Sequence, residues 1–177
     1  MSARISSLGW AERLWDAVSP PRTVYAHCDI PCGIYDPHEA QISALTALRM
    51  DQLIAELAMP AMDAKPEDRA AYVSKLARYT AVKESHAERV KQEVRVIWAD
   101  FFTPDHLKAT PGVHDLSWKI LKQASKVRQG TAVADAQELL KLVQEFAELF
   151  WKTKGVPTRR IPSQQKSGGE LVLPSPA

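Results

Sequence analysis

The sequence predicts an all-α protein, an up-and-down four-helix bundle preceded by a loop that carries both cysteines. Four long segments repeat apolar residues at steps of three, four or seven, which is the period of an amphipathic helix. Prolines and glycines separate these segments by short connections, and short connections favour antiparallel neighbours. No run of alternating apolar and polar residues indicates a strand.

Length and composition are those of one globular domain with tails. The chain has 177 residues, of which 45% are hydrophobic and 25% charged, with a formal net charge of +2. So weak a charge gives no dense basic face, and we expect no nucleic-acid partner. No run of about 18 apolar residues predicts a membrane span, and the N-terminus lacks a signal-peptide core. With only two cysteines, we expect a cytoplasmic protein with reduced thiols.

The chain divides into four parts. They are a leader at residues 1–26, a loop at 27–36, the helical bundle at 37–155 and a tail at 156–177. The leader can hold one short amphipathic helix, which Pro20 and Pro21 end because proline cannot continue a helix. The tail holds four prolines, two glycines and several polar residues, so we expect it to be disordered.

Each predicted helix has a recognisable beginning or end. The helices are expected over residues 37–58, 66–101, 111–129 and 131–154, with a connector of about one turn at 105–109. Asp36 suits the N-cap of the first helix because its carboxylate can accept a backbone N–H, and Pro37 suits the first helical position. Pro104 follows the end of the second helix, Gly130 ends the third and Gly155 ends the fourth.

The loop at residues 27–36 holds the candidate metal ligands. Cys28 and Cys32 are four residues apart and His27 precedes them, while Pro31 and Gly33 prevent a regular helix. Imidazole suits nickel, copper and zinc, and a planar set of backbone nitrogen and thiolates suits nickel(II) or copper(II). By spacing alone, the two thiols also fit a reversible disulfide or a pair of inert cysteines, since C-x3-C is a weak signal.

The complete string is far more specific than the spacing. Residues 27–37 read HCDIPCGIYDP, which resembles the nickel hook of the nickel-containing superoxide dismutases, H-C-x-x-P-C-G-x-Y, at every fixed position. The likeness continues in VKE at 82–84, in VIWADFFTPDH at 96–106 and in FWKTK at 150–154. It covers about residues 27–154, so the sequence predicts a four-helix bundle with an N-terminal metal-binding hook.

The resemblance implies a precursor that a processing peptidase cuts between Ala26 and His27. The new α-amine of His27, the amide nitrogen and thiolate of Cys28 and the thiolate of Cys32 then hold one nickel ion per subunit, with the His27 imidazole as axial ligand. The resemblance also implies a homohexamer that disproportionates superoxide to dioxygen and hydrogen peroxide by cycling between nickel(II) and nickel(III). Tyr35 matches the tyrosine that limits access to the metal.

Three positions depart from the family pattern. Ser43 stands where the family has a glutamate that hydrogen-bonds the axial imidazole, His86 replaces the arginine that supports this glutamate, and Phe101 replaces a tyrosine. Asp29 and Pro31 match hook positions that shape the loop. Either Ser43 and His86 form a substitute hydrogen-bonded pair, or His86 is simply a polar residue of its helix.

Two alternatives to an enzyme remain, and the three departures support the first of them. Residues around a metal site orient its ligands and tune the metal, so their replacement favours a nickel-binding or redox-sensing helical protein with low turnover. A helical interaction module with an incidental cysteine pair is the remaining alternative.

Overall fold

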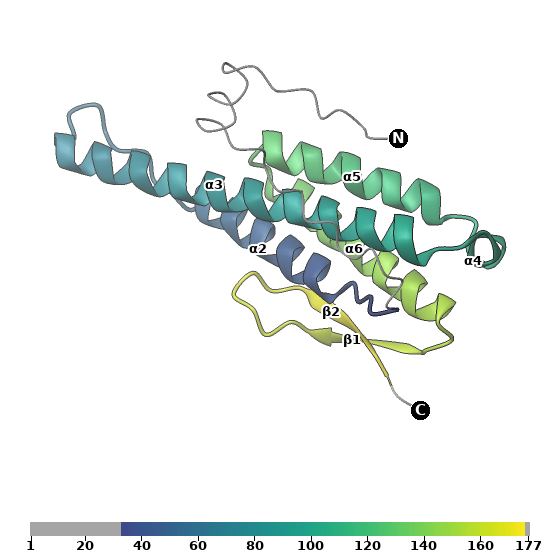
Figure 1. Ribbon diagram of the computed structural model, residues 1–177. Coiled ribbons are helices and arrows are strands. Elements are labelled where there is room, and N and C mark those ends of the chain that lie inside the picture. The colour runs from purple at the N-terminus through teal and green to yellow at the C-terminus, as the bar shows by residue number, and fades with distance from the viewer. Residues whose placement is uncertain (1–32, 176–177) are drawn as a thin grey trace, which may run out of the picture. The chain divides into compact units, whose positions relative to one another are not determined.

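The computed structural model describes residues 33–175 (Figure 1). Its elements are α2 (His38–Ala55), α3 (Pro66–Val96), the π-helix η1 (Ile97–Phe101), α4 (Pro104–Ala109), α5 (Val113–Gln129), α6 (Val133–Thr153), β1 (Thr158–Pro162) and β2 (Glu170–Pro174). The leader and the hook residues His27, Cys28, Asp29, Pro31 and Cys32 lie outside the described residues.

The four long helices form an up-and-down bundle, as predicted. Helix α2 packs against α3 and α6, and α5 packs against the same two helices, so α6 closes the ring with α2 (Figure 1). The interior consists of apolar side chains from all four helices, which are fully buried at Ala44, Val90, Val94, Ile120, Ala124, Leu139, Val143, Phe146 and Phe150. Alanines on α2 allow its backbone to approach its neighbours closely.

Helix α2 begins one residue later than predicted, with Pro37 rather than Asp36 as its N-cap residue. The Asp36 carboxylate accepts a hydrogen bond from the backbone N–H of His38 at 2.8 Å, which satisfies one of the free donors of the first turn. The helix ends at Ala55, three residues earlier than predicted. The chain thus leaves the helix well before Pro60, whose ring disfavours helical backbone in the residue before it.

The second predicted helix is divided in the structure. Regular α3 ends at Val96, and the next turn widens into η1. The wider turn and the extended Phe102 after it allow two consecutive aromatic rings to contact α6: Phe101 lies 4.7 Å from Phe150 and Phe102 lies 6.1 Å from Phe146, centroid to centroid. Short π-helices occur frequently at functional sites.

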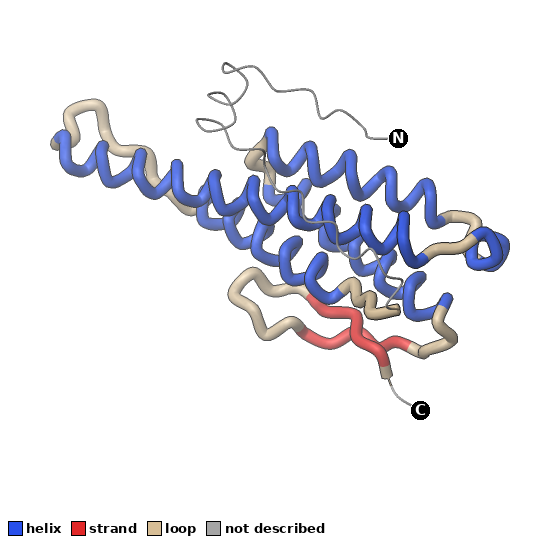
Figure 2. Tube along the Cα trace, in the orientation of Figure 1, coloured by secondary structure: helices blue, strands red, loops and turns tan. Residues whose placement is uncertain are grey.

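The C-terminal tail is ordered, so the prediction of a disordered tail at 156–177 is wrong for its described part. Strands β1 and β2 form an antiparallel hairpin in which Arg160 lies opposite Val172. The prolines that favoured disorder lie at the strand ends, where Pro162 and Pro174 interrupt no central ladder. Figure 2 shows the hairpin against one side of the bundle, and β2 contacts both α2 and α6.

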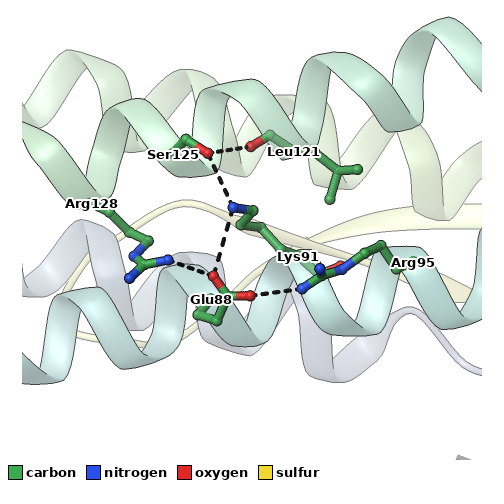
Figure 3. A network of polar contacts seen from close by, with 6 residues as sticks. All are labelled: Glu88, Lys91, Arg95, Leu121, Ser125 and Arg128. Carbon is green, nitrogen blue, oxygen red and sulfur yellow. Dashed lines mark hydrogen bonds and ion pairs between the residues drawn. The ribbon is translucent and has the colours of Figure 1, made fainter.

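A charged cluster joins α3 to α5 on the surface (Figure 3). Glu88 accepts hydrogen bonds from Arg95 at 2.7 Å and from Arg128 of α5 at 2.6 Å, and the Lys91 ammonium lies 3.7 Å from the same carboxylate. Lys91 also donates to Ser125 of α5 at 3.1 Å. The cluster therefore fixes the register of the two helices at their exposed edge.

Across residues 33–175, no helix is long and apolar enough to cross a membrane.

Candidate metal centre

Phe101 is the centre of an aromatic cluster at the end of η1. Its ring lies 5.9 Å from that of Tyr35, the tyrosine at the end of the hook pattern. It also lies 5.1 Å from His106, with 23° between the planes, and 4.7 Å from Phe150 of α6. The structure thus brings together Tyr35 and Phe101, two predicted site residues that are 66 positions apart in the sequence.

His106, the last residue of the family-like string at 96–106, belongs to the same cluster. Its backbone N–H donates to Thr103 Oγ1 at 3.4 Å, and its Nδ1 accepts from the backbone N–H of Thr103 at 3.3 Å. This reciprocal cap holds the imidazole over the Phe101 ring. The signal that could have identified it is the final histidine of the string at 96–106.

Ser43 and His86 lie at the same level of the bundle. Helix α2 and helix α3 are joined by Glu39 with Arg89, at 2.9 Å, and by Asp51 with Lys83, at 3.2 Å. Along both helices, Ser43 and His86 fall between these two ion pairs. The antiparallel register therefore places the two departures from the family pattern on facing stretches of adjacent helices.

Neither residue has a hydrogen-bond partner for its buried polar atom among the described residues. Ser43 is 0% exposed and its Oγ is unpaired, and Nδ1 of His86 is buried and unpaired as well. The substitute hydrogen bond between Ser43 Oγ and His86 Nδ1 is therefore not formed. Because a buried polar atom left unpaired costs about 1–3 kcal/mol, these two atoms fit a site that a further polar group completes.

A buried ion pair between Lys83 of α3 and Asp51 of α2 lies near Ser43 and His86 in the sequences of the same two helices. Lys83 and Asp51 are 1% and 0% exposed, and the Lys83 ammonium also donates to the backbone carbonyl of Gly130. Burial raises the pKa of the Asp51 carboxyl, and the hydrogen bond and charge of Lys83 only partly oppose this. The pair ties α2 and α3 to the end of α5 and so fixes the register that aligns Ser43 with His86.

The chain leaves the hook through a backbone conformation that suits only glycine. Gly33 has a φ of +72°, in the left-handed region that other residues rarely adopt. This explains why glycine follows the second cysteine in the C-G pair of the hook pattern. Tyr35 then packs against the core two residues later and Pro37 is buried, so these two residues anchor the described end of the hook.

Within residues 33–175, no group of three histidine, cysteine or carboxylate side chains could hold a metal ion. The predicted ligands His27, Cys28 and Cys32 all lie outside this range.

Fold and sequence together define a four-helix bundle whose first helix follows a thiol-bearing loop. Residues 22–154 match the family model of the nickel-containing superoxide dismutases, which covers well over half of the chain. The chain therefore belongs to the nickel-containing superoxide dismutase family.

Characterised relatives agree with this assignment. A nickel superoxide dismutase of Streptomyces coelicolor is 33% identical over 136 residues, which are 77% of this chain and 94% of the relative. One from Streptomyces seoulensis is 32% identical over the same shares. A native nickel superoxide dismutase structure superposes with a TM-score of 0.62 at 32% identity, over 72% of this chain and 99% of that chain. The family match ends at residue 154, before the C-terminal hairpin.

Proposed function

We propose that this protein is a nickel-dependent superoxide dismutase that binds one nickel ion per subunit. The observation that carries the proposal is the string HCDIPCGIYDP, complete at every fixed position and directly before the first helix of a bundle with the family fold. Two superoxide ions and two protons give one dioxygen and one hydrogen peroxide. When bound, nickel supplies the one-electron couple between nickel(II) and nickel(III) that this reaction needs.

The proposed ligands are the α-amine and imidazole of His27, the amide nitrogen and thiolate of Cys28 and the thiolate of Cys32. The amine exists only after cleavage between Ala26 and His27, because the same nitrogen is an amide in the uncut chain. An α-amine has a pKa of about 8, so metal binding can displace its proton near neutral pH. Cleavage by a processing peptidase therefore switches the site on.

Tyr35 limits access to the site, and its ring packs against that of Phe101. Phe101 in turn stacks on His106, so ring contacts at 5.9 Å and 5.1 Å connect the end of the hook to helix α4. Phe101 offers no hydroxyl where the family pattern has a tyrosine. Access is therefore governed here by packing, with one polar group fewer near the substrate.

If nickel is bound as the family resemblance implies, Ser43 and His86 would help to orient the His27 imidazole. Both carry a buried polar atom without a partner among the described residues, and both occupy family positions that serve the axial ligand. A serine is shorter than a glutamate and carries no charge, so we expect a weaker hold on the imidazole. Asp29 and Pro31 shape the loop, since proline fixes φ near −65°.

The test compares protein that begins at His27 with the full-length chain. The shortened protein should bind one nickel ion per subunit and consume superoxide, whereas the full-length chain should not bind nickel in this mode. Cys32→Ser should abolish both nickel binding and turnover. Full activity of Cys32→Ser would refute the ligand assignment, and stoichiometric nickel without turnover would favour the low-turnover alternative.

Assembly as a homohexamer and a cytoplasmic location are part of the same proposal. The hexamer rests on the family resemblance, and light scattering of the nickel-loaded protein tests it against the mass of the subunit that begins at His27. The cytoplasmic location rests on the cysteine usage of the chain, since thiols stay reduced in that compartment.

A further inference from the structure

The C-terminal hairpin is attached to α2 by a side chain that takes the place of a neighbouring strand. The backbone N–H of Val172 donates to Gln41 Oε1 at 2.7 Å, and Gln41 Nε2 donates to the carbonyl of Val172 at 3.0 Å. Gln41 is 0% exposed and Val172 is 1% exposed. A buried amide that pairs with both polar groups of one residue fixes the position of that strand closely.

Three further contacts attach the hairpin to α2 and α6. Gln52 donates to the carbonyl of Ser167 at 3.0 Å, and Gln144 of α6 donates to the carbonyl of Glu170 at 2.7 Å. At Gly169 the backbone approaches the helices so closely that an added Cβ would lie 2.9 Å from Leu140 Cδ2. The hairpin therefore contacts the groove between α2 and α6 at residue-specific points.

The order of these contacts shows the direction of the strand. Ser167 is bonded to Gln52, and Val172, which comes later in the chain, is bonded to Gln41, which comes earlier in α2. Strand β2 thus runs antiparallel to α2, toward the first turn of that helix (Figure 1). Gln41 itself donates its backbone N–H to the carbonyl of Pro37, in that first turn.

We infer that residues 156–175 form a clamp that positions the start of α2, and with it the anchor of the hook at Gly33–Pro37. Gln41 is the positioning residue. The inference rests on the proposed function for the part that concerns nickel. A loop that is anchored before it binds loses less conformational freedom on binding, so the clamp raises the nickel affinity of the hook.

The location of the clamp fits this role. The first turn of a helix has backbone N–H groups without helical partners and frays readily, and Asp36 satisfies only one of them with its side chain. The hairpin lies beyond the family match, in a chain that lacks the usual glutamate and arginine at Ser43 and His86. An added anchor for the hook therefore accompanies the loss of its usual support.

The test uses Gln41→Leu with Gln52→Leu as its matched control. Both residues are α2 glutamines that bond the hairpin backbone, but Gln52 lies three turns further from the hook. In nickel-free full-length protein, amide hydrogen exchange at residues 38–41 should rise by about tenfold in Gln41→Leu and remain near the wild-type rate in Gln52→Leu. Exchange in α6 reports whether the bundle as a whole has been weakened.

The nickel affinity of the same variants, prepared to begin at His27, gives the second readout. Competition with a chelator should show a Kd raised by about tenfold for Gln41→Leu and changed less than about twofold for Gln52→Leu. A chain that ends at Gly155 should reproduce both effects of Gln41→Leu. Equal exchange at residues 38–41 in the two variants would overturn the clamp, and so would an unchanged Kd despite faster exchange. If the wild-type protein bound no nickel, the proposed function would fail, and the exchange data would still decide the clamp.

Discussion

The Lys83 ammonium lies 3.2 Å from Asp51 Oδ1 in the interior of the bundle, where both side chains are almost completely buried. The sequence showed Lys83 only as part of a family-like string, yet the lysine joins α3 to α2 and, through the carbonyl of Gly130, to the end of α5. The alignment of Ser43 with His86 depends on this pair.

Removing one member of the pair should destabilise the fold strongly. Lys83→Met leaves the Asp51 carboxylate buried without a counter-charge, and such changes cost about 3–5 kcal/mol. Denaturant unfolding at neutral pH measures the loss. The double variant Lys83→Met with Asp51→Leu should recover much of it, because no charge then remains buried; a double variant as unstable as Lys83→Met would contradict this account.

The loss of stability in Lys83→Met should depend on pH. Burial already raises the pKa of Asp51, and removing Lys83 removes the hydrogen bond and charge that oppose the shift, so protonation favours the fold and the deficit should shrink as the pH falls from about 8 to about 5. The double variant Lys83→Met with Asp51→Leu lacks this carboxyl, so its deficit should not shrink in the same way. A Lys83→Met deficit that stays constant over this range would show that the loss has another cause.

The ion pairs of Glu88 should stabilise the fold near neutral pH and lose this effect in acid. Partial burial opposes its ionisation, but the hydrogen bond from Arg95 and the charges of Lys91, Arg95 and Arg128 together hold the pKa of Glu88 below its ordinary value of 4.5. A lowered folded pKa means that the stabilisation is complete above 4.5 and is lost as the pH falls through the folded value.

Glu88→Gln tests this pH dependence. The variant should lose less than about 1 kcal/mol per ion pair at pH 7, because these pairs are partly exposed, and its Tm should fall less steeply than that of the wild type below pH 4.5. Glu138 offers a matched control in Glu138→Gln, because its ion pair with Lys141 lies at 4.0 Å on the surface and is the only one it makes within residues 33–175. If Tm fell equally steeply below pH 4.5 in the wild type and in Glu88→Gln, the ion pairs of Glu88 would not be the cause of the acid sensitivity.

Restoring the family pair should strengthen the hold on nickel. Ser43→Glu alone places a carboxylate in a buried position without a partner, and should lower both stability and nickel retention. Adding His86→Arg supplies the partner across the same level of α2 and α3. The double-mutant cycle should show a favourable coupling of about 1–3 kcal/mol in unfolding, together with slower nickel loss to a chelator. Additive effects would mean that the two positions do not meet.

Substitutions at two neighbouring glycines of the hairpin distinguish the cost of backbone strain from the cost of a steric clash. Gly168 and Gly169 have φ values of +73° and +79°, but an added Cβ meets nothing within 4 Å at Gly168 and lies 2.9 Å from Leu140 at Gly169. Gly168→Ala should therefore cost only the backbone strain, about 1 kcal/mol. Gly169→Ala should cost about 1–3 kcal/mol more in thermal unfolding. Equal losses would indicate that the hairpin is not seated in the groove.

The helices and the hook pattern could be predicted because their signals are local. Apolar residues at helical spacing, Asp36 with Pro37 at one end and Gly155 at the other specify helices through neighbours a few residues away. The string from His27 to Pro37 concentrates its chemistry in eleven consecutive positions. Such features require no knowledge of distant contacts.

The hairpin and the surroundings of the site depend on contacts between residues far apart in the sequence. The prolines, glycines and polar residues of the tail predicted disorder. A two-stranded hairpin is marginal on its own, but this one is bonded at Val172 to Gln41, which is 131 residues away in the sequence. The wide turn of η1 follows from aromatic packing on α6, and the pairing of Lys83 with Asp51 follows from the helix register. The sequence by itself determined the helices, the hook motif and the family. The contacts that hold the start of α2, and the residues that face Ser43, were decided only by tertiary packing. These contacts are strong because they are buried, and burial requires segments that are far apart in the sequence.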